Sequence, residues 1–207
     1  GASLSLQELT LEAWAMIEDP GVNRAALVNK GANFGNYTLA VRGSDAVSGN
    51  QVEYVHALPE GNYNCCGAEP PPVVYGDWIH LAIAISGETA RLYVNGLLVA
   101  SDAGAQPPVE NETSLFLGRL LGEDPAFMRG VLDEVRIWNV AWTGEDIAAT
   151  YNKTLGGPTP GLVAYWKFDE EGGGAVLDSS GSGNHGILGN GDTGIPARVM
   201  STAPIVP

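Results

Sequence analysis

The sequence predicts an all-β protein of antiparallel strands with one short helix. Glycine is abundant at 28 residues, 13 prolines are scattered along the chain, and only 16% of residues are charged. Short apolar runs recur with a period of two, which is typical of strands with one face in a core. A chain of 207 residues can bury a substantial core. We therefore expect many strands and many turns rather than a helical bundle.

The net charge excludes two classes of partner. The formal charge is −14 at pH 7. Nucleic-acid phosphates and anionic membrane surfaces both require Lys and Arg, so we expect no nucleic-acid partner and no attraction to an anionic membrane. No apolar run is long enough to span a bilayer, which predicts no membrane insertion. Excess carboxylate is compatible with bound divalent cations and with an extracellular setting.

The first part of the chain predicts four strands and a loop. In the first strand, Leu9, Leu11, Ala13, Ala15 and Ile17 share one face. We expect these four strands at residues 9–17, 25–29, 37–42 and 51–58. Residues 59–75 contain three successive prolines and predict a long surface loop, a kind of segment that is often functional.

The middle of the chain predicts further strands and the helix. Asn95-Gly96 between apolar runs is a strong hairpin signal, because a type I′ turn needs positive φ at both positions. In the strand at 130–140, Leu132, Glu134, Arg136 and Trp138 should lie opposite Asp133, Val135 and Ile137. The other strands are expected at residues 77–86, 90–95, 97–101 and 113–119. Thr143 with Asp146 resembles a capping box and predicts a short helix, which the glycines and prolines of 156–160 should end.

Residues 161–186, GLVAYWKFDEEGGGAVLDSSGSGNHG, combine a strand with a polar glycine loop. Alternation predicts a strand at 162–169, with Leu162, Ala164, Trp166 and Phe168 on one face. The loop concentrates Asp178, Ser180, Asn184 and several glycines, and such oxygen-rich loops suit a hard cation such as Ca²⁺. The alternative is a plain turn, in which Asp178 and Asn184 bond their own backbone.

The strings GDWIHLAIAI, ARLYVNGLLVAS and GVLDEVRIWNVAWTGEDIAATY resemble the latter part of LamG-like, concanavalin A-like jelly-roll domains. The segment GLVAYWKFDEEGGGAVLDSSGSGNHG resembles their opening part, which here stands last. Either the domain is circularly permuted or the chain spans parts of two tandem repeats. We favour permutation, and so predict a single domain at residues 1–207, with core strands in 1–152 and a C-terminal segment, 161–207, that completes the sandwich.

The resemblance implies an antiparallel two-sheet jelly roll that binds glycans or proteins without catalysis. Such modules are typically extracellular or on the cell surface, often in adhesion proteins, and many hold a structural Ca²⁺. The resemblance assigns the Asp of the DxVRxW-like strand to that ion together with the glycine loop. The implied ligands are Asp133, Asp178, Ser180, Gly183, Asn184 and His185.

Cysteines and loop tyrosines predict the ligand-binding rim. Cys65 and Cys66 are adjacent, so they form a rare vicinal disulfide, stay free thiols or bond another chain. A vicinal ring beside Tyr63 would make an apolar platform and would support an oxidising, exported setting. Tyr37 and Tyr75 stand in or beside loops and complete the candidate sugar platform.

The sequence gives little support for an enzyme. Glycosidases of this jelly-roll type carry paired carboxylates as ExDxE or ExDxxE, and neither spacing occurs. GxSxG, HExxH and P-loop motifs are also absent from the sequence. We therefore predict a non-catalytic extracellular module that binds carbohydrate and is stabilised by Ca²⁺. The alternative is a structural or protein–protein interaction module of a multidomain surface protein. Ligand identity and oligomeric state stay open.

Overall fold

A computed structural model of the chain describes residues 3–21, 24–32, 34–43, 50–65, 72–121, 126–189 and 195–207. Within these residues the fold is a sandwich of two antiparallel sheets, as the sequence predicts. The six-stranded sheet has the order β13-β12-β1-β6-β7-β8. Its strands are β1 (Leu9–Ile17), β6 (Trp78–Ser86), β7 (Thr89–Val94), β8 (Leu97–Asp102), β12 (Gly130–Trp138) and β13 (Leu162–Trp166).

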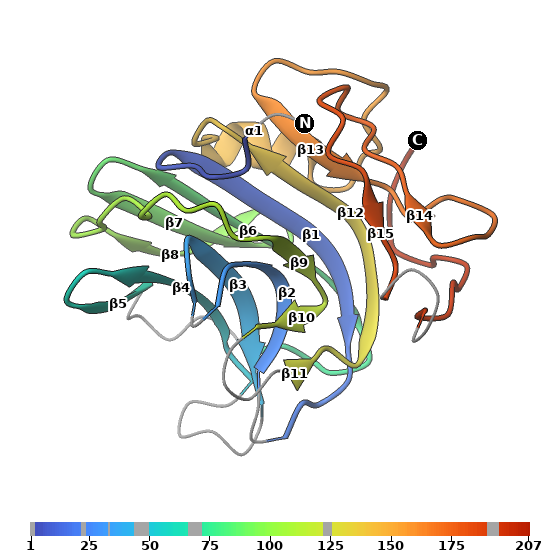
Figure 1. The fold of residues 1–207 in the computed structure, drawn as a ribbon, viewed down its shortest axis with the longest axis horizontal. Helices are drawn as coiled ribbons and strands as arrows, with labels where there is room; N and C mark the ends of the chain where they lie inside the picture. The colour runs from blue at the N-terminus through green and yellow to red at the C-terminus, as the bar shows by residue number, and fades with distance from the viewer. Residues whose placement is uncertain are drawn as a thin grey trace.

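The five-stranded sheet faces it in the order β5-β4-β3-β2-β9 (Figure 1). Its strands are β2 (Arg24–Lys30), β3 (Tyr37–Arg42), β4 (Val52–Leu58), β5 (Gly61–Cys65) and β9 (Leu115–Leu117). Two small hairpins pair β10 (Arg119–Leu120) with β11 (Ala126–Phe127) and β14 (Ala175–Val176) with β15 (Gly186–Ile187). β5 was not predicted: it lies inside the expected loop at 59–75, where the chain turns back and pairs with β4.

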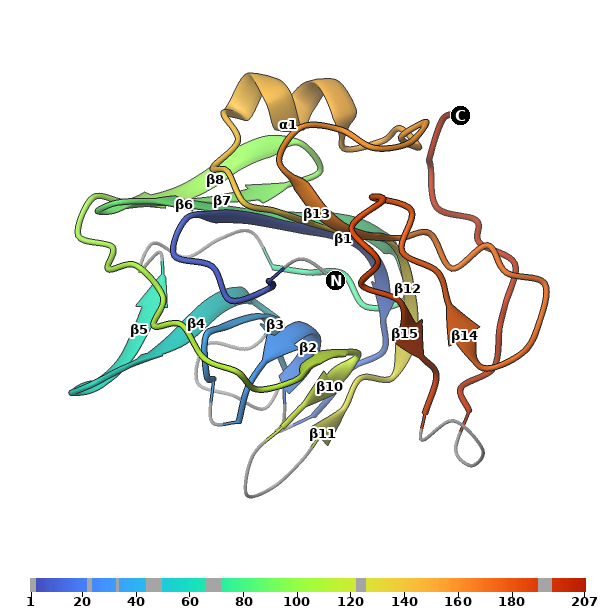
Figure 2. The same cartoon turned by 45° about the horizontal axis from the view of Figure 1, so that its top comes forward.

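The hydrophobic core lies between the two sheets, which Figure 2 shows stacked one above the other. The alternation of β1 and β6 places their aliphatic residues in this core as predicted. These residues are Leu9, Leu11, Ala13, Ala15, Ile17, Ile79, Leu81, Ile83 and Ile85. Their burial, at roughly 25 cal/mol per Å² of apolar surface, supplies the main driving force that holds the sheets together.

The strand β12 departs from simple alternation. Its register with β1 shifts between Glu12 and Trp14, and Glu134 takes a positive φ of 49°. A bulge of this kind adds one residue to a strand and changes the face of the residues before it. Leu132 therefore packs against the core together with Val135 and Ile137, and the predicted face shared by Leu132 and Trp138 is wrong.

The helix α1 (Gly144–Thr150) covers the outer face of the six-stranded sheet (Figure 2). The predicted capping box is present: the Asp146 N–H donates to Thr143 Oγ1, and the Thr143 N–H donates to the Asp146 carboxylate. Ile147 is fully buried against Ala82 and Tyr93. In the described part of the chain no helix has the length and apolar character needed to cross a bilayer.

The C-terminal segment joins the sandwich at its edge. β13 pairs antiparallel with β12, and Trp166 packs in the main core. The tail returns to the turn after α1, where Val206 pairs with Lys153 and the Thr154 N–H donates to the Val206 carbonyl. Whether residues 1–207 form one complete domain stays a prediction.

Replacing Gly130 by alanine tests the close approach of β1 and β12. Gly130 has φ +139°, and an added Cβ would lie 2.1 Å from the Met16 carbonyl oxygen. We expect Gly130→Ala to lower the free energy of unfolding by about 3 kcal/mol or more, measured by urea titration. The matched control is Gly173→Ala, since Gly173 also has positive φ but open space around it. That change should cost only about 1 kcal/mol from backbone strain. Equal losses of unfolding free energy in the two variants would contradict the register between β1 and β12.

Candidate functional site

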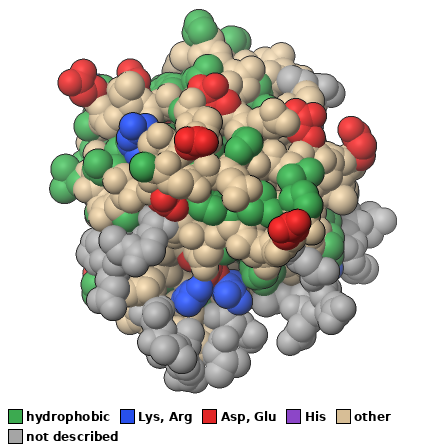
Figure 3. All heavy atoms as spheres, turned by 90° about the vertical axis from the view of Figure 1, so that its left-hand side faces the viewer, with side chains coloured by type: hydrophobic (Ala, Val, Ile, Leu, Met, Phe, Trp, Pro, Cys, Tyr) green, Lys and Arg blue, Asp and Glu red, His purple; other side chains and the backbone are tan. Residues whose placement is uncertain are grey.

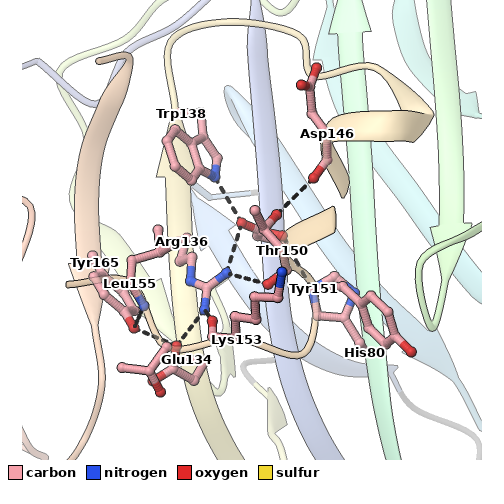
Figure 4. Close-up of polar contacts among 12 residues, drawn as sticks. His80, Glu134, Arg136, Trp138, Asp146, Thr150, Tyr151, Lys153, Leu155 and Tyr165 are labelled. Atoms are coloured by element: carbon pink, nitrogen blue, oxygen red, sulfur yellow. Dashed lines mark hydrogen bonds and ion pairs between the residues drawn. The ribbon is translucent and has the colours of Figure 1, made fainter. Parts of the chain in front are cut away.

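Two glutamates lie close together on the outer face of the six-stranded sheet, bridged by one arginine. Arg136 Nη1 lies 3.4 Å from the Glu12 carboxylate, and its Nη2 contacts the Glu134 carboxylate. Glu12 also accepts a hydrogen bond of 2.9 Å from Trp138 Nε1 and lies 3.2 Å from His80 Nε2. Figure 4 shows His80 of β6 and Glu134, Arg136 and Trp138 of β12 converging on this cluster.

The end of α1 and the turn after it cover this cluster of Glu12, Glu134 and Arg136. Arg136 donates to the carbonyl oxygens of Thr150 and Lys153. Tyr165 donates its hydroxyl to Glu134 from the neighbouring strand β13 (Figure 4). Glu12 is 0% exposed and Glu134 is 4% exposed. The two carboxylates are therefore sealed from any substrate.

The electrostatics of Glu12 fit a structural role. Burial by itself raises the pKa of a carboxyl, but the His80 hydrogen bond, the Arg136 charge and the Trp138 N–H lower the pKa of Glu12 to about 2. Glycoside hydrolysis needs two carboxyls that face a cleft, one of them with a raised pKa. Both carboxylates of this pair are buried away from solvent, so the pair is not placed to act on a sugar.

The predicted metal loop is built around Asp178 by hydrogen bonds. Asp178 Oδ1 accepts the backbone N–H groups of Tyr165 at 2.9 Å and Ser180 at 2.8 Å, and Oδ2 accepts that of Asn184 at 2.8 Å. His185 Nδ1 accepts the Asp178 N–H at 3.0 Å. Burial raises the pKa of Asp178, but these donors outweigh it and hold the pKa below its usual range. The loop is the Asx-type turn that the sequence left as its alternative.

The remaining predicted ligands do not complete a cation site. Ser180 Oγ accepts the Ser182 N–H, and the Asn184 amide donates to the Val163 carbonyl. Gly183 lies in the same turn with φ +77° and adds no side chain. These four loop positions, 178, 180, 183 and 184, and His185 do come together as predicted.

The hydrogen-bond partners of Asp133 are Glu134 and Ser201, which are not part of this loop. Asp133 Oδ1 accepts the Glu134 N–H at 2.8 Å. Burial and the nearby charges of Glu134 and Asp169 raise its pKa, against a hydrogen bond from Ser201. No group of three or more His, Cys, Asp or Glu side chains among the described residues is arranged to hold a metal. Ca²⁺ prefers six to eight oxygen ligands, whereas N–H donors surround Asp178, so the residues present do not fit the ion.

Two predicted ligand residues are buried, which is a correction. Tyr37 is 0% exposed because it alternates with Leu39 and Val41 on the core face of β3, and its hydroxyl donates to the Leu4 carbonyl. Cys65 is 7% exposed because it stands opposite Tyr54 at the end of β5. Neither side chain presents a platform at the rim.

Cys65 carries no free thiol, since it is disulfide-bonded. Cys66 lies outside the described residues, so the vicinal ring stays a prediction.

Tyr63 joins the two sheets at their open edge. Its hydroxyl on β5 donates to Asp102 Oδ2 on β8 at 2.7 Å, and its ring lies 4.9 Å from that of His56. Hydrogen bonds from Gly104 and Tyr63 lower the pKa of Asp102. His56 is fully buried, with Nδ1 3.2 Å from the Tyr54 hydroxyl. Tyr63 therefore closes the sandwich instead of standing free for a sugar.

A surface pocket of about 230 Å³ collects polar side chains from four segments, and we call it the Lys30 pocket. Its lining is Ser3, Leu4, Ser5, Lys30, Asn111, Glu112, Thr113, Leu115 and Asn184. Lys30 Nζ donates to the Asn111 carbonyl and side-chain oxygens and to the Thr113 carbonyl at 2.6 Å. The Ser5 hydroxyl accepts the Asn111 N–H at 2.7 Å. Asn184 is the predicted site residue that reaches it.

Glu112 is the exposed acidic group of the Lys30 pocket. Burial lowers the pKa of Lys30, and the charge of Glu112 opposes that shift. Glu112 is exposed, and no hydrogen bond or ion pair of its carboxylate is found within the described part of the chain. Sequence reasoning missed Lys30 and residues 111–113, because only the fold brings them beside Asn184.

A second polar cluster that sequence reasoning missed lies on the outer face of the five-stranded sheet. Glu53 on β4 contacts Arg24 Nε on β2 and Arg42 Nε on β3, the latter at 2.6 Å. Tyr75, a predicted ligand residue, donates its hydroxyl to the Arg42 carbonyl at 2.9 Å. Burial, with Asp19 nearby, raises the pKa of Tyr75 to about 12. The sequence signal that could have identified these arginines was the period-two alternation of their strands, which places them on the face opposite the core residues.

The sequence matches a known family over most of its length. A profile described as the concanavalin A-like lectin/glucanases superfamily matches residues 1–148. The search of curated proteins found none that matches the chain.

Solved structures share the fold. A candidate carbohydrate-binding protein from Bacteroides ovatus ATCC 8483 superposes with a TM-score of 0.70 at 22% identity, covering 89% of this chain and 53% of its own, so the chain spans about half of that protein. Domain 4 of AbnA, a GH43 extracellular arabinanase from Geobacillus stearothermophilus in complex with arabinotriose, gives 0.54 at 22% identity over 70% and 67%. The CBM40 of the Ruminococcus gnavus IT-sialidase, bound to α2,3-sialyllactose, gives 0.54 at 16% over 71% and 84%. At these identities the likeness shows the fold alone.

Replacing Asp178 by asparagine tests the turn against the metal site. The change puts an amide donor against backbone N–H groups and removes charge-assisted bonds, so we expect a loss of about 2–4 kcal/mol in unfolding free energy. The loss should be the same in CaCl₂ and in chelator, by thermal and urea melts. Asp77→Asn, at an exposed position, is the control and should change little. A calcium-dependent rise in melting temperature that Asp178→Asn abolishes would restore the metal site.

The buried His56 predicts a pH dependence of stability. Burial lowers its pKa from 6.5 to about 4. The unfolded chain therefore takes up this proton first, and the stabilisation present above pH 6.5 is lost as pH falls toward 4. We expect about 2 kcal/mol of unfolding free energy to be lost between pH 7 and pH 5 through this group. Urea titrations of His56→Gln should show a flatter profile over that interval. An unchanged slope in the variant would rule out His56 as its source.

Proposed function

The chain belongs to the concanavalin A-like lectin/glucanases superfamily, and on that premise we propose that it is a non-catalytic module that binds carbohydrate in the Lys30 pocket. The observation that carries the proposal is the lining of that pocket. Hydroxyl, amide, carboxylate and ammonium groups from four segments meet there beside two leucines. Sugars present hydroxyls that both donate and accept, together with small apolar faces, and this mixture of groups suits them.

Preorganisation supports binding at this pocket. Lys30 uses its ammonium group to hold the chain at Asn111 and Thr113, and Ser5 ties the N-terminal segment to the same loop. Because these groups are already fixed, a ligand would not have to order them, which lowers the entropic cost of binding. Glu112 then offers two carboxylate oxygens as acceptors for a pair of sugar hydroxyls.

The absence of catalysis is part of the same proposal. Glu12 and Glu134, which share Arg136 as a partner, are buried beneath α1 and the turn that follows it. Glu53 is likewise held between two arginines. Two of the similar structures are of domains attached to glycosidases and were determined with arabinotriose and sialyllactose, a setting in which a separate binding module is useful.

We place the module outside the cell, and we leave calcium out of the binding mechanism. The disulfide state of Cys65 is the observation that supports an oxidising compartment. Calcium binding stays a prediction of the sequence, and the hydrogen bonds around Asp178 weigh against it.

A glycan array followed by calorimetry on the strongest ligand tests this function. We expect Glu112→Ala to weaken the affinity for that glycan at least tenfold, because it removes the free acceptor of the pocket. The melting temperature should stay unchanged, since Glu112 is exposed. Glu110→Ala removes a neighbouring exposed charge outside the pocket and should bind as the parent does. A blank array, or equal affinities for Glu112→Ala and the parent, would contradict the proposal.

A further inference from the structure

The Arg24–Glu53–Arg42 cluster places more positive charge than its buried carboxylate needs. The Glu53 side chain is 4% exposed and lies beneath the arginines, whose side chains are 35% and 28% exposed. One guanidinium is enough to neutralise one carboxylate, so the cluster keeps a net charge of about +1 at the surface. The chain as a whole carries −14, and Figure 3 shows acidic side chains spread over the face around β5, β7 and β8.

The register of the sheet makes this arrangement costly. Arg24 and Arg42 are direct cross-strand partners in the β2–β3 pair. Like charges that stand opposite one another in an antiparallel pair destabilise it. Glu53 offsets part of that repulsion from below, and a second anion arriving from solvent would offset the rest. A local cost of this kind is typical of a functional site.

The two guanidinium groups are held in place for such an anion. Both contact Glu53 through Nε, and Arg24 also lies 5.2 Å from the centre of the Phe34 ring. Each guanidinium is planar and has a second, end-on pair of N–H groups besides the edge that carries Nε, and that pair matches the two oxygens of a carboxylate. Tyr75 fixes the backbone at Arg42 through its hydroxyl.

We propose that Arg24 and Arg42 form a binding site for the carboxylate of an acidic sugar, with Glu53 as the residue that positions them. The carboxylate receives paired N–H donors from one or both guanidinium groups and replaces the solvent above Glu53. The choice of a sugar acid over other carboxylates rests on the proposed carbohydrate-binding function. The guanidinium site itself is separate from the Lys30 pocket.

The two sites lie at opposite ends of one strand. Arg24 is the first residue of β2 and Lys30 is the last. Six steps of about 3.3 Å separate their backbones by about 20 Å. A change in one site should therefore leave the other intact, which makes the two proposals separable.

Calorimetry of the full chain with matched probes tests the acidic-sugar site. The pairs are 3′-sialyllactose against its sialic acid methyl ester and trigalacturonic acid against its methyl ester, which differ chiefly by the charge of the carboxylate. We expect one acidic member to bind at least tenfold more tightly than its neutral partner, and the pair that does so identifies the kind of sugar acid. Arg24→Gln and Arg42→Gln should each reduce that preference to less than threefold.

Control variants separate binding at this site from a general effect of net charge and from binding at the Lys30 pocket. Arg91→Gln removes an exposed arginine of β7 and should keep the preference. Glu112→Ala should lose affinity for the array glycan and keep the acidic preference. Each arginine variant leaves the other arginine on Glu53, so melting temperatures should stay close to the parent's.

Three outcomes would overturn the inference. The first is equal binding of acidic and neutral partners while the array glycan still binds, which leaves the proposed function standing. The second is a preference that survives both Arg24→Gln and Arg42→Gln, which locates the carboxylate elsewhere. The third is a preference that falls equally in Arg91→Gln, which reduces the effect to net charge.

Discussion

The buried charge of Glu12 is the constraint on which the outer face of the six-stranded sheet depends. A carboxylate with no exposure has to be paired, and Arg136, His80 and Trp138 supply the partners from β12 and β6. Arg136 in turn needs acceptors, which the carbonyls of Thr150 and Lys153 provide. The position of α1 and its turn over the sheet follows from this chain of requirements. The bulge at Glu134 brings a second carboxylate to the same arginine.

This use of charge distinguishes the interior from the surface. On the helix side, the carboxylates of Glu12 and Glu134 are bound by structural partners and have almost no access to solvent. On the five-stranded sheet the balance is reversed, because Glu53 is buried while its two arginines reach the surface. At the far end of β2, the Lys30 ammonium group donates to the Thr113 carbonyl, and Glu112 stays exposed beside it. A single strand thus carries a neutral polar pocket at one end and a basic cluster at the other.

Local patterns predicted the fold well, whereas the pocket and the clusters described above depend on contacts between distant segments. Alternation in β1 and β6, the Asn95-Gly96 turn and the Thr143–Asp146 cap each depend on neighbours in sequence, so they were readable. The bulge at Glu134 and the strand β5 depend on partners across the sheet, and both were missed. Tyr37 was misplaced at the rim because nothing local shows which face of β3 meets the opposite sheet. The Asp178 loop came together as expected, but its oxygens face N–H donors. The Lys30 pocket joins residues 3–5, Lys30, 111–113, Leu115 and Asn184, which no spacing in the sequence connects.

The central claim is that a sugar occupies the Lys30 pocket, and amide chemical-shift mapping of the labelled chain tests it most directly. On titration with a glycan that binds, we expect the largest shifts at Ser5, Asn111, Glu112, Thr113 and Asn184. Amides of the β7–β8 hairpin and of α1 should stay unchanged. Large shifts confined to that hairpin, or to the Tyr63–Asp102 edge, would contradict the claim and move the site away from the Lys30 pocket.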